Sequence, residues 1–154
     1  MIRGLAAALL AAALSSMATV AECGWLITPE EAARAGPPPV ADALPAAAEE
    51  GPGPLIVVMN PKALERLHSP VNILVRFEAG GSGEPPDMQS LTVTLRGFIS
   101  IDITDRLRAY LLGATLAVRE AELPVGNHRI RLMVADVAGN LSARDVTLIV
   151  VATE

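Results

Sequence analysis

The stretch LPVGNHRIRLMVADVAGNLSARDVTLIVV, residues 123–151, decides the fold, because two runs of alternating apolar residues flank a short polar segment. The apolar positions of both runs are even-numbered, so they share one face of a sheet only if the connecting loop has an odd number of residues. A three-residue loop at 137–139 meets this condition, with Gly139 in the left-handed conformation. Asp136 and Asn140 flank the loop, and the Asp136 carboxylate can accept bonds from its N–H groups. We therefore predict that Asp136, Gly139 and Asn140 form a structural turn of a β-hairpin.

The same period of two dominates the chain from Pro54 onward. Together with apolar runs near residues 57 and 116, the alternating runs make about seven short strands separated by Gly- and Pro-containing turns. The inward positions predicted for the alternating runs are Val71, Ile73, Val75, Phe77, Leu91, Val93, Leu95, Ile99, Ile101, Ile103, Ile130, Leu132, Val134, Val146, Leu148 and Val150. Half-buried alternation favours antiparallel sheets with one face in water. About seven strands in roughly 100 residues match a single immunoglobulin-type (Ig-like) β-sandwich, so we predict an all-β domain over 54–154.

In the predicted hairpin register, Arg131 stands opposite Asp145 on the outer face. We expect this to be a surface ion pair, which adds little to stability.

The charge distribution argues against a nucleic-acid partner. The net charge is −5, and residues 22–54 hold six acidic residues against one arginine. Residues 55–154 hold ten Lys and Arg against eleven Asp and Glu, so this part is nearly neutral. Neutralising several phosphates requires a basic surplus, and this sequence has none.

The N-terminus predicts export. A short basic start, MIR, precedes the uncharged stretch GLAAALLAAALSSMATVA, which ends in small residues. This pattern is typical of a secretory signal peptide over 1–21, with cleavage after Ala21. A periplasmic or secreted protein is therefore expected, with no integral membrane span once the signal is removed. Two alternatives remain: an uncleaved signal that anchors the chain, and lipidation of Cys23, the only cysteine, which Glu22 in the preceding position disfavours.

Residues 22–53 are predicted to form a flexible tether with a short helix at 28–35. Thr28 and Glu31 match a capping box, and Pro29 suits the first helical position. Seven of the twelve prolines lie in residues 28–54, and this Pro/Ala/Glu-rich composition cannot bury a core.

The only tryptophan lies on this tether. Trp25, with Leu26 and Ile27, is the candidate contact for a protein partner, because Trp is enriched at binding hot spots. The alternative is that Trp25 folds back on the domain or on the short helix.

The hairpin quoted above resembles the last hairpin of bacterial Ig-like domains of secreted and surface proteins. That hairpin commonly reads L-P-x-G-x-Y, a strand, and then D-x-A-G-N-x-S; here the motifs read LPVGNH (123–128) and DVAGNLS (136–142). The likeness extends weakly back to SPVNILVRF (69–77), so it covers about residues 54–152. The order of signal, WLITPEEA and Pro-rich spacer is also similar to a group of short exported proteobacterial proteins of unknown function.

The resemblance implies an Ig-like fold and a role as a spacer, adhesion module or binding module. His128 stands where the family usually has Tyr, whose hydroxyl latches the corner before the strand. The resemblance therefore implies either a weaker latch here or one made by an imidazole hydrogen bond.

No motif in the sequence points to catalysis, a cofactor or a metal. His68 and His128 lie about 60 residues apart without ligand-spaced companions, and there is no G-x-S-x-G elbow. A hydrolase would need a serine, a histidine and an acid to converge in space. Calcium binding would have to use the dispersed acids Asp102, Asp105, Asp136 and Asp145. Arg106 and Arg108 are expected to lie in a solvated loop, balanced by Asp102 and Asp105.

These patterns together predict a non-catalytic exported Ig-like module that acts by binding or spacing in the bacterial envelope. Its expected partner is an envelope protein. The alternative is an accessory subunit of an envelope complex that docks through the Trp25 segment; a calcium-binding adhesion domain or a hydrolase are remote alternatives.

Overall fold

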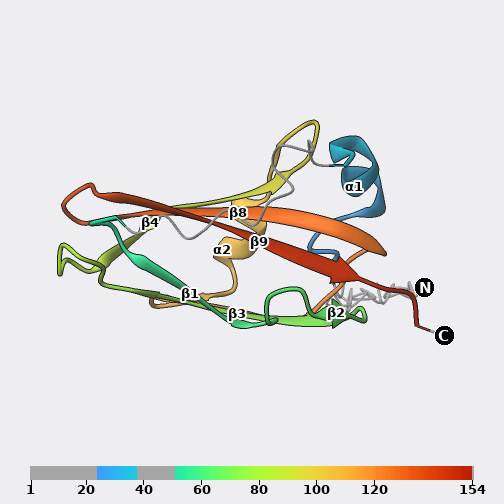
Figure 1. Cartoon of the computed structure of the whole chain (residues 1–154), viewed down its shortest axis with the longest axis horizontal. Helices are drawn as coiled ribbons and strands as arrows, with labels where there is room; N and C mark the ends of the chain where they lie inside the picture. Colours follow the sequence, from blue (N-terminus) through green and yellow to red (C-terminus); the bar gives the residue numbers. More distant parts are fainter. Residues whose placement is uncertain (1–23, 38–50, 154) are drawn as a thin grey trace, which may run out of the picture.

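The computed structural model describes residues 24–37 and 51–153, which are mostly β. Their strands form two sheets that lie face to face, the upper and lower layers of Figure 1. The first sheet has the order β1 (Leu55–Asn60), β3 (Val71–Glu78), β7 (Thr115–Ala121) and β6 (Leu111–Leu112). The second has the order β2 (Arg66–Leu67), β9 (Leu141–Val150), β8 (Gly126–Asp136), β4 (Pro86–Arg96) and β5 (Ile101–Asp102). Neighbouring strands are antiparallel, apart from the parallel pair β2 and β9.

The alternating apolar residues fill the space between the sheets, which confirms the predicted inward face of β3, β4, β8 and β9. Ile73 and Val146 are partly buried and pack against the core. The buried members are Val71, Val75, Phe77, Leu91, Val93, Leu95, Ile130, Leu132, Val134, Leu148 and Val150. Burying each such side chain contributes about 1.5–3 kcal/mol, so this aliphatic set is the main force holding the sheets together.

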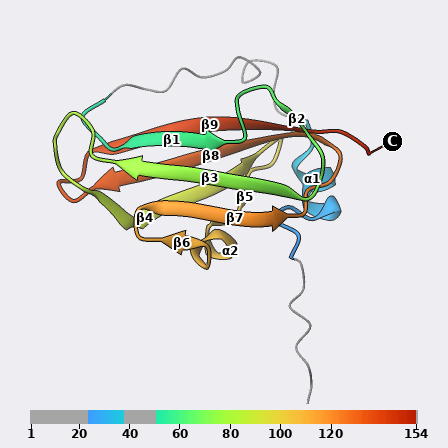
Figure 2. The same ribbon diagram turned by 90° about the horizontal axis from the view of Figure 1, so that it is seen from below.

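The two open sides between the sheets are closed in different ways, one by a side-chain hydrogen bond and the other by a helix. On one side, Arg144 of β9 donates from Nη1 to the backbone carbonyl of Ile56 in edge strand β1, at 2.6 Å. On the other side lies the helix α2 (Thr104–Arg108), which Figure 2 shows beside β6 and away from β1 and β9. The α2 residue Leu107 is buried, and the Thr104 hydroxyl accepts the Val93 N–H at 2.8 Å. The Arg144 bond therefore links the two sheets on one side, and α2 covers the space between them on the other side.

The β8–β9 hairpin has the register predicted from the sequence. Asp136 N–H donates to the Asn140 carbonyl, so the loop consists of residues 137–139, and Gly139 has a φ of +92°. The Asp136 carboxylate accepts bonds from the Ala138 and Asn140 N–H groups, the Asn140 amide and the Ser82 hydroxyl. These bonds, the one from Ser82 foremost, hold the pKa of Asp136 at about 2. The turn is therefore a structural unit, as predicted.

Residues 98–104 depart from the predicted strand. Only Ile101–Asp102 form a strand, and the chain enters α2 two residues later. Ile103 is buried and Ile101 partly buried, but Ile99 is exposed, so its predicted inward position is wrong. The physical reason is that the Ile99 N–H donates to the Ala35 carbonyl at 3.1 Å, which draws this loop toward the N-terminal segment and out of the sheet.

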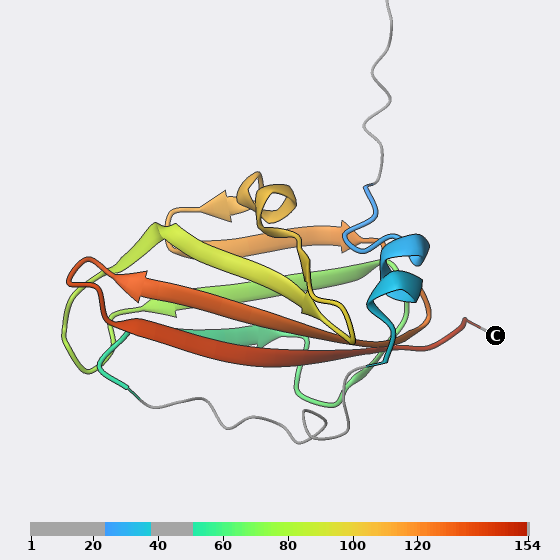
Figure 3. The ribbon, with the colours of Figure 1, turned by 90° about the horizontal axis from the view of Figure 1, so that it is seen from above.

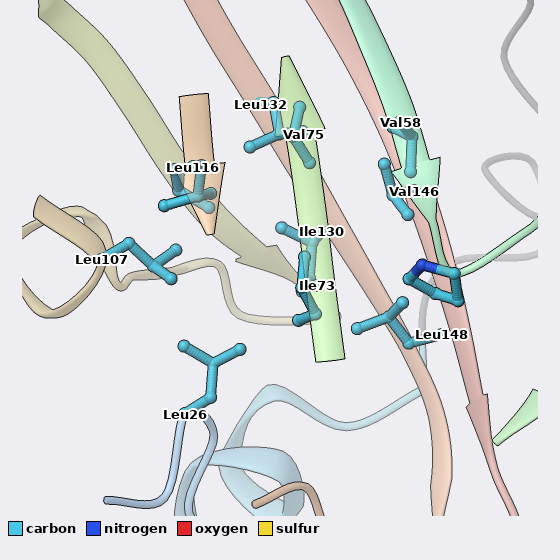
Figure 4. A pocket seen from close by; sticks show the side chains of 12 residues that line it. Leu26, Val58, Ile73, Val75, Leu107, Leu116, Ile130, Leu132, Val146 and Leu148 are labelled. Carbon is cyan, nitrogen blue, oxygen red and sulfur yellow. The ribbon is translucent and has the colours of Figure 1, made fainter. Parts of the chain in front are cut away.

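A small cavity remains at the centre of the core. Its volume is about 30 Å³, and Figure 4 shows side chains from both sheets, α2 and the N-terminal segment pointing toward it. The lining residues are Leu26, Val58, Pro61, Ile73, Val75, Val93, Leu107, Leu116, Ile130, Leu132, Val146 and Leu148. All of these side chains are apolar, so the cavity offers a water molecule no hydrogen-bond partner from a side chain.

Candidate functional site

The N-terminal segment, residues 24–37, lies against one end of the two sheets (Figure 1). Trp25 forms a parallel β-bridge with Glu122, just beyond β7, and the Leu26 N–H donates to the Glu122 carbonyl at 3.0 Å. Leu26 and Ile27 are buried in the core. This segment is therefore part of the folded domain.

Two predictions about the tether are corrected by this arrangement. Residues 24–37 do not form a free tether, and Leu26 and Ile27 are not available to a partner, because their aliphatic side chains are removed from water against the domain. Trp25 remains 41% exposed, as a partner contact requires. The predicted signal peptide (1–21), Cys23 and the rest of the tether (38–50) lie outside the described residues.

The helix α1 (Pro29–Ala35) begins with the predicted capping box. The Thr28 hydroxyl accepts the Glu31 N–H at 3.1 Å, and the Glu31 carboxylate accepts the Thr28 N–H at 3.0 Å. A helix of seven residues is marginal by itself, so its packing against the domain must supply the remaining stability.

Arg106 of α2 anchors this helix. Its guanidinium donates to both oxygens of the Glu31 carboxylate, at 2.9 Å each, and to the Leu26 carbonyl at 2.6 Å. The Arg106 hydrogen bond, supported by the bonds from Thr28, lowers the pKa of Glu31 to about 2 against the opposing effect of partial burial. The prediction that Arg106 lies in a solvated loop is therefore wrong: its neighbouring acids do not bind it, whereas a distant one does.

The C-terminal end of α1 rests on the loop between β4 and β5. A Cβ atom at Gly97 would lie 2.3 Å from the Ala35 carbonyl oxygen, so only glycine permits this approach. The exposed residue Phe98 follows, with its Cβ 3.7 Å from the position that a Cβ on Gly36 would take. Gly97 thus allows a helix end and an exposed aromatic side chain to lie side by side.

A groove runs between α1 and the beginning of β8. Figure 3 shows the helix lying across this end of the second sheet. The groove has a volume of about 720 Å³ and is lined by Pro29, Ala32, Ala33, Ala35, Gly36, Pro37, Leu95, Arg96, Pro124, Val125, Gly126, Asn127 and His128. Small residues of α1 form one wall, and residues 124–128 at the beginning of β8 form the other. Val125 on that wall is 65% exposed, and Phe98 beside the helix end is 85% exposed.

His128 stabilises the wall formed by residues 124–128. Its side chain is buried, and Nε2 lies 2.6 Å from the Pro124 carbonyl oxygen. Because a carbonyl only accepts, Nε2 carries the proton in this bond. The resemblance implied either a weaker corner or one held by an imidazole hydrogen bond. The structure shows the imidazole hydrogen bond.

An arginine cluster occupies the outer face of the second sheet; we use this name for Arg96, Arg129 and Arg131 with Asp145. Asp145 stands opposite Arg131, as predicted, and accepts bonds from Arg131 at 2.7 and 3.0 Å and from Arg129 at 2.8 Å. The side chains of Asp145 and Arg129 are only 4% and 7% exposed. The expectation that Arg131 and Asp145 form a pair on the surface is therefore wrong, because the Asp145 carboxylate is buried.

The pKa of Asp145 reflects this setting. Burial acts to raise it, but the bonds from Arg131 and Arg129 together outweigh burial and lower it. The carboxylate is consequently held in its charged form.

The remaining sequence candidates do not come together. Among residues 24–37 and 51–153, no group of three or more His, Cys, Asp or Glu residues could hold a metal ion. Asp102 accepts the Thr104 N–H and Asp136 belongs to the turn, so both acids have local structural roles. Ser82 donates to Asp136 and His128 bonds to Pro124, so these candidate hydrolase groups have structural partners as well.

Comparison with known proteins gives no relative: no family model matches the chain, and no curated protein or solved structure is significantly similar to it. In the described part of the chain, neither helix is long and apolar enough to cross a membrane.

The groove and Phe98 were not found from the sequence. The sequence predicts α1, but its position depends on contacts with residues that are distant in the chain. Gly97 next to an aromatic residue, together with the alanines of α1, was the available signal for a close approach of two segments.

Proposed function

We propose that this chain is a small exported, non-catalytic Ig-like module that binds a protein partner in the bacterial envelope. The strand order supports the Ig-like assignment. With β1 as strand A, β3 as B, β4 as C, β5 as C′, β6 as D, β7 as E, β8 as F and β9 as G, the sheets read A-B-E-D and G-F-C-C′. This order agrees with the Ig arrangement with one added C′ strand, and β2 extends the second sheet beside G.

The corner before β8 gives further support. Many Ig-like domains have a Tyr near the start of strand F whose hydroxyl bonds to backbone a few residues upstream. His128 occupies this position and bonds to the carbonyl four residues upstream. The signal-like sequence of residues 1–21 supports export.

The observation that carries a binding role is the groove between α1 and β8, with exposed Phe98 and Val125 beside it. A concave, largely apolar surface next to large exposed apolar side chains is typical of a protein contact site. Among the polar groups nearby, Thr28 and Glu31 make the capping bonds of α1 and His128 makes the corner bond to Pro124. The features of this groove therefore favour a binding role over a catalytic one.

The second candidate is an accessory subunit of an envelope complex that docks through Trp25. The observation that favours it is the 41% exposure of this large aromatic side chain beside a β-bridge.

Cross-linked affinity capture from envelope fractions tests and separates these proposals, using the exported chain and three single variants. Phe98→Ser removes the exposed aromatic residue beside the groove, Trp25→Ser removes the N-terminal one, and Leu112→Ser is a matched control on β6, also highly exposed. Loss of one partner only with Phe98→Ser supports groove binding, and loss only with Trp25→Ser supports the accessory subunit. A partner set that none of the variants changes contradicts both and leaves a spacer role.

A further inference from the structure

We propose that the outer face of the first sheet is an interface between two copies of this chain. Its long strands are β1, β3 and β7, and Figure 2 views the molecule from this side, where no other described helix or strand lies over them. Residues of a strand alternate between the core and the outer face. The outward-facing residues are Leu55, Val57, Met59, Asn72, Leu74, Arg76, Glu78, Thr115, Ala117 and Arg119.

The centre of this face is apolar. Leu74 of β3 pairs with Ala117 of β7, and Val57 and Met59 lie on β1, on the other side of β3. Met59 is 48% exposed, and the other three side chains are partly exposed. An exposed apolar patch that crosses neighbouring strands is typical of a protein contact.

The outer face of the second sheet is different. Met133 lies at its centre, and the outward-facing residues around it on β4, β8 and β9 include Thr92, Thr94, Arg131, Asp145 and Thr147. Such a polar surface is expected of an antiparallel sheet that faces water. The apolar centre is therefore a property of the first sheet and not of the chain as a whole.

The charged residues of the first sheet suit a contact between identical faces. Arg76 and Glu78 lie toward one end of β3 and form an ion pair of 2.6 Å. Arg119 and Glu120 lie toward the other end, where the Glu120 N–H donates to the Asn72 side chain. Each end therefore has one base and one acid, and two such faces do not repel each other.

Twofold symmetry brings the two different ends together. In a twofold dimer the same patch meets itself, and an axis across the strands reverses their direction. Leu74 lies near the middle of β3, between the charged ends, so it would pack against its counterpart in the second copy. The Arg76–Glu78 end of each copy would then lie over the Arg119–Glu120 end of the other, which places acids within reach of bases.

The size of the face fits a weak dimer. Four strands about 4.8 Å apart, with a length of about 26 Å for the eight residues of β3, cover about 500 Å². Two copies would bury about 1,000 Å², which is near the lower limit for a specific interface. Leu112 of the edge strand β6 lies at the rim, where contacts add little to affinity. We therefore expect a dissociation constant in the micromolar range.

This dimer would leave the groove between α1 and β8 open. The groove lies beside the second sheet, which is the opposite layer in Figure 1. Two copies joined through their first sheets would therefore present two grooves that point away from each other. This consequence, unlike the dimer itself, rests on the proposed binding role: two linked sites bind a partner with two epitopes more tightly than one site does.

Sedimentation velocity of the purified protein over about 1–300 µM tests the proposal. A reductant keeps Cys23 from linking two chains. We expect the wild type to dimerise as its concentration rises, and Leu74→Lys, which places a charge at the centre of the face, to weaken association at least about tenfold. Met133→Lys is the matched control, because Met133 is an outward-facing, partly exposed residue of the second sheet; it should associate like the wild type.

An exchange of charges tests the orientation of the two copies. Glu78→Arg gives one end of the face two bases, and Arg119→Glu gives the other end two acids. The double variant keeps the net charge of the chain. We expect it to associate about fivefold more tightly than the wild type, because the reversed ends place bases over acids. It would associate less tightly if like ends met.

A wild-type protein that stays monomeric throughout this concentration range overturns the proposal, whatever its groove binds. Equal association of Leu74→Lys and Met133→Lys overturns it as well, and so does a double variant that associates less tightly than the wild type. Circular dichroism checks that each variant is folded. If Leu74→Lys is not, the double variant still decides, because both of its changes are at surface positions.

Discussion

Arg106 and Glu31 are 75 residues apart in the sequence, yet their side chains form two hydrogen bonds of 2.9 Å. This ion pair fastens α1 to α2 and so joins the N-terminal segment to the body of the domain. Arg106 also binds the Leu26 carbonyl, so one side chain holds the segment at two points.

We expect Glu31→Gln to weaken this attachment and to lower the free energy of unfolding by about 1–2 kcal/mol at pH 7. The substitution removes the charge that Arg106 binds while keeping an acceptor for the capping box. The expected loss of stability is modest because the Arg106 side chain is partly exposed. Urea unfolding followed by far-UV circular dichroism measures the change. An unchanged midpoint would show that the charge of Glu31 contributes nothing to stability.

The same ion pair makes the free energy of unfolding depend on pH. The pKa of Glu31 is about 2 in the folded chain, below its ordinary value of 4.5. Its contribution is therefore complete above about pH 4.5 and is lost as the pH falls through 2. The pKa values of Asp136 and Asp145 are lowered as well, so the wild type should lose stability steadily from pH 5 to pH 2. Glu31→Gln should lose less over this range, and parallel curves would refute the role of Glu31.

Gly97→Ala should separate α1 from the β4–β5 loop. The added Cβ would meet the Ala35 carbonyl oxygen at 2.3 Å, and this backbone contact cannot be relieved by a side-chain movement. We expect a loss of about 1–3 kcal/mol in the free energy of unfolding. Gly51→Ala is the control, since a Cβ there has no neighbour within 4 Å. Equal midpoints for the two variants in thermal unfolding would contradict the observed contact.

The local features of this fold could be predicted from the sequence, because each depends on residues close together in the chain. Alternation placed Val93 and Leu132 in the core, loop parity placed Gly139 in the turn, and the Thr28–Glu31 spacing located the beginning of α1. Strands β2 and β6 have two residues each, which is too short for any alternation to show.

The position of α1 could not be predicted, because it depends on Arg106 and on the Ile99–Ala35 hydrogen bond. Both contacts join segments that are distant in the sequence. The groove exists only once these contacts form, so neither the groove nor the exposed Phe98 could be predicted from composition or period.

His128→Phe tests the corner that supports the groove. Phenylalanine keeps a ring of similar size but cannot donate to the Pro124 carbonyl, which then loses this partner. We expect a loss of about 1–3 kcal/mol in stability and faster amide exchange around Val125. His128→Tyr introduces a side chain whose hydroxyl can donate a hydrogen bond, and it should recover part of the loss. A His128→Phe variant as stable as the wild type would contradict a stabilising role for the hydrogen bond between His128 and Pro124.

The core cavity allows a substitution that should stabilise the protein. Val75 is buried, lines the cavity and is shown in Figure 4. Val75→Ile adds one methylene to a space of about 30 Å³ and should raise the free energy of unfolding by up to about 1 kcal/mol. Val75→Ala enlarges the space and should lower it by about 2 kcal/mol. Calorimetry on both variants checks the prediction. The prediction fails if Val75→Ile lowers the free energy of unfolding more than Val75→Ala does.

The groove, and with it the proposed binding role, depends on the N-terminal segment being held against the two sheets in solution. Residue-resolved amide hydrogen exchange of the purified protein tests this most directly. We expect the Leu26 N–H, bonded to Glu122, and the Ile99 N–H, bonded to Ala35, to exchange at least a hundredfold more slowly than in an unfolded chain. Exchange of both amides at the unfolded rate, with β8 and β9 still protected, would show that the segment is free and that the groove does not exist.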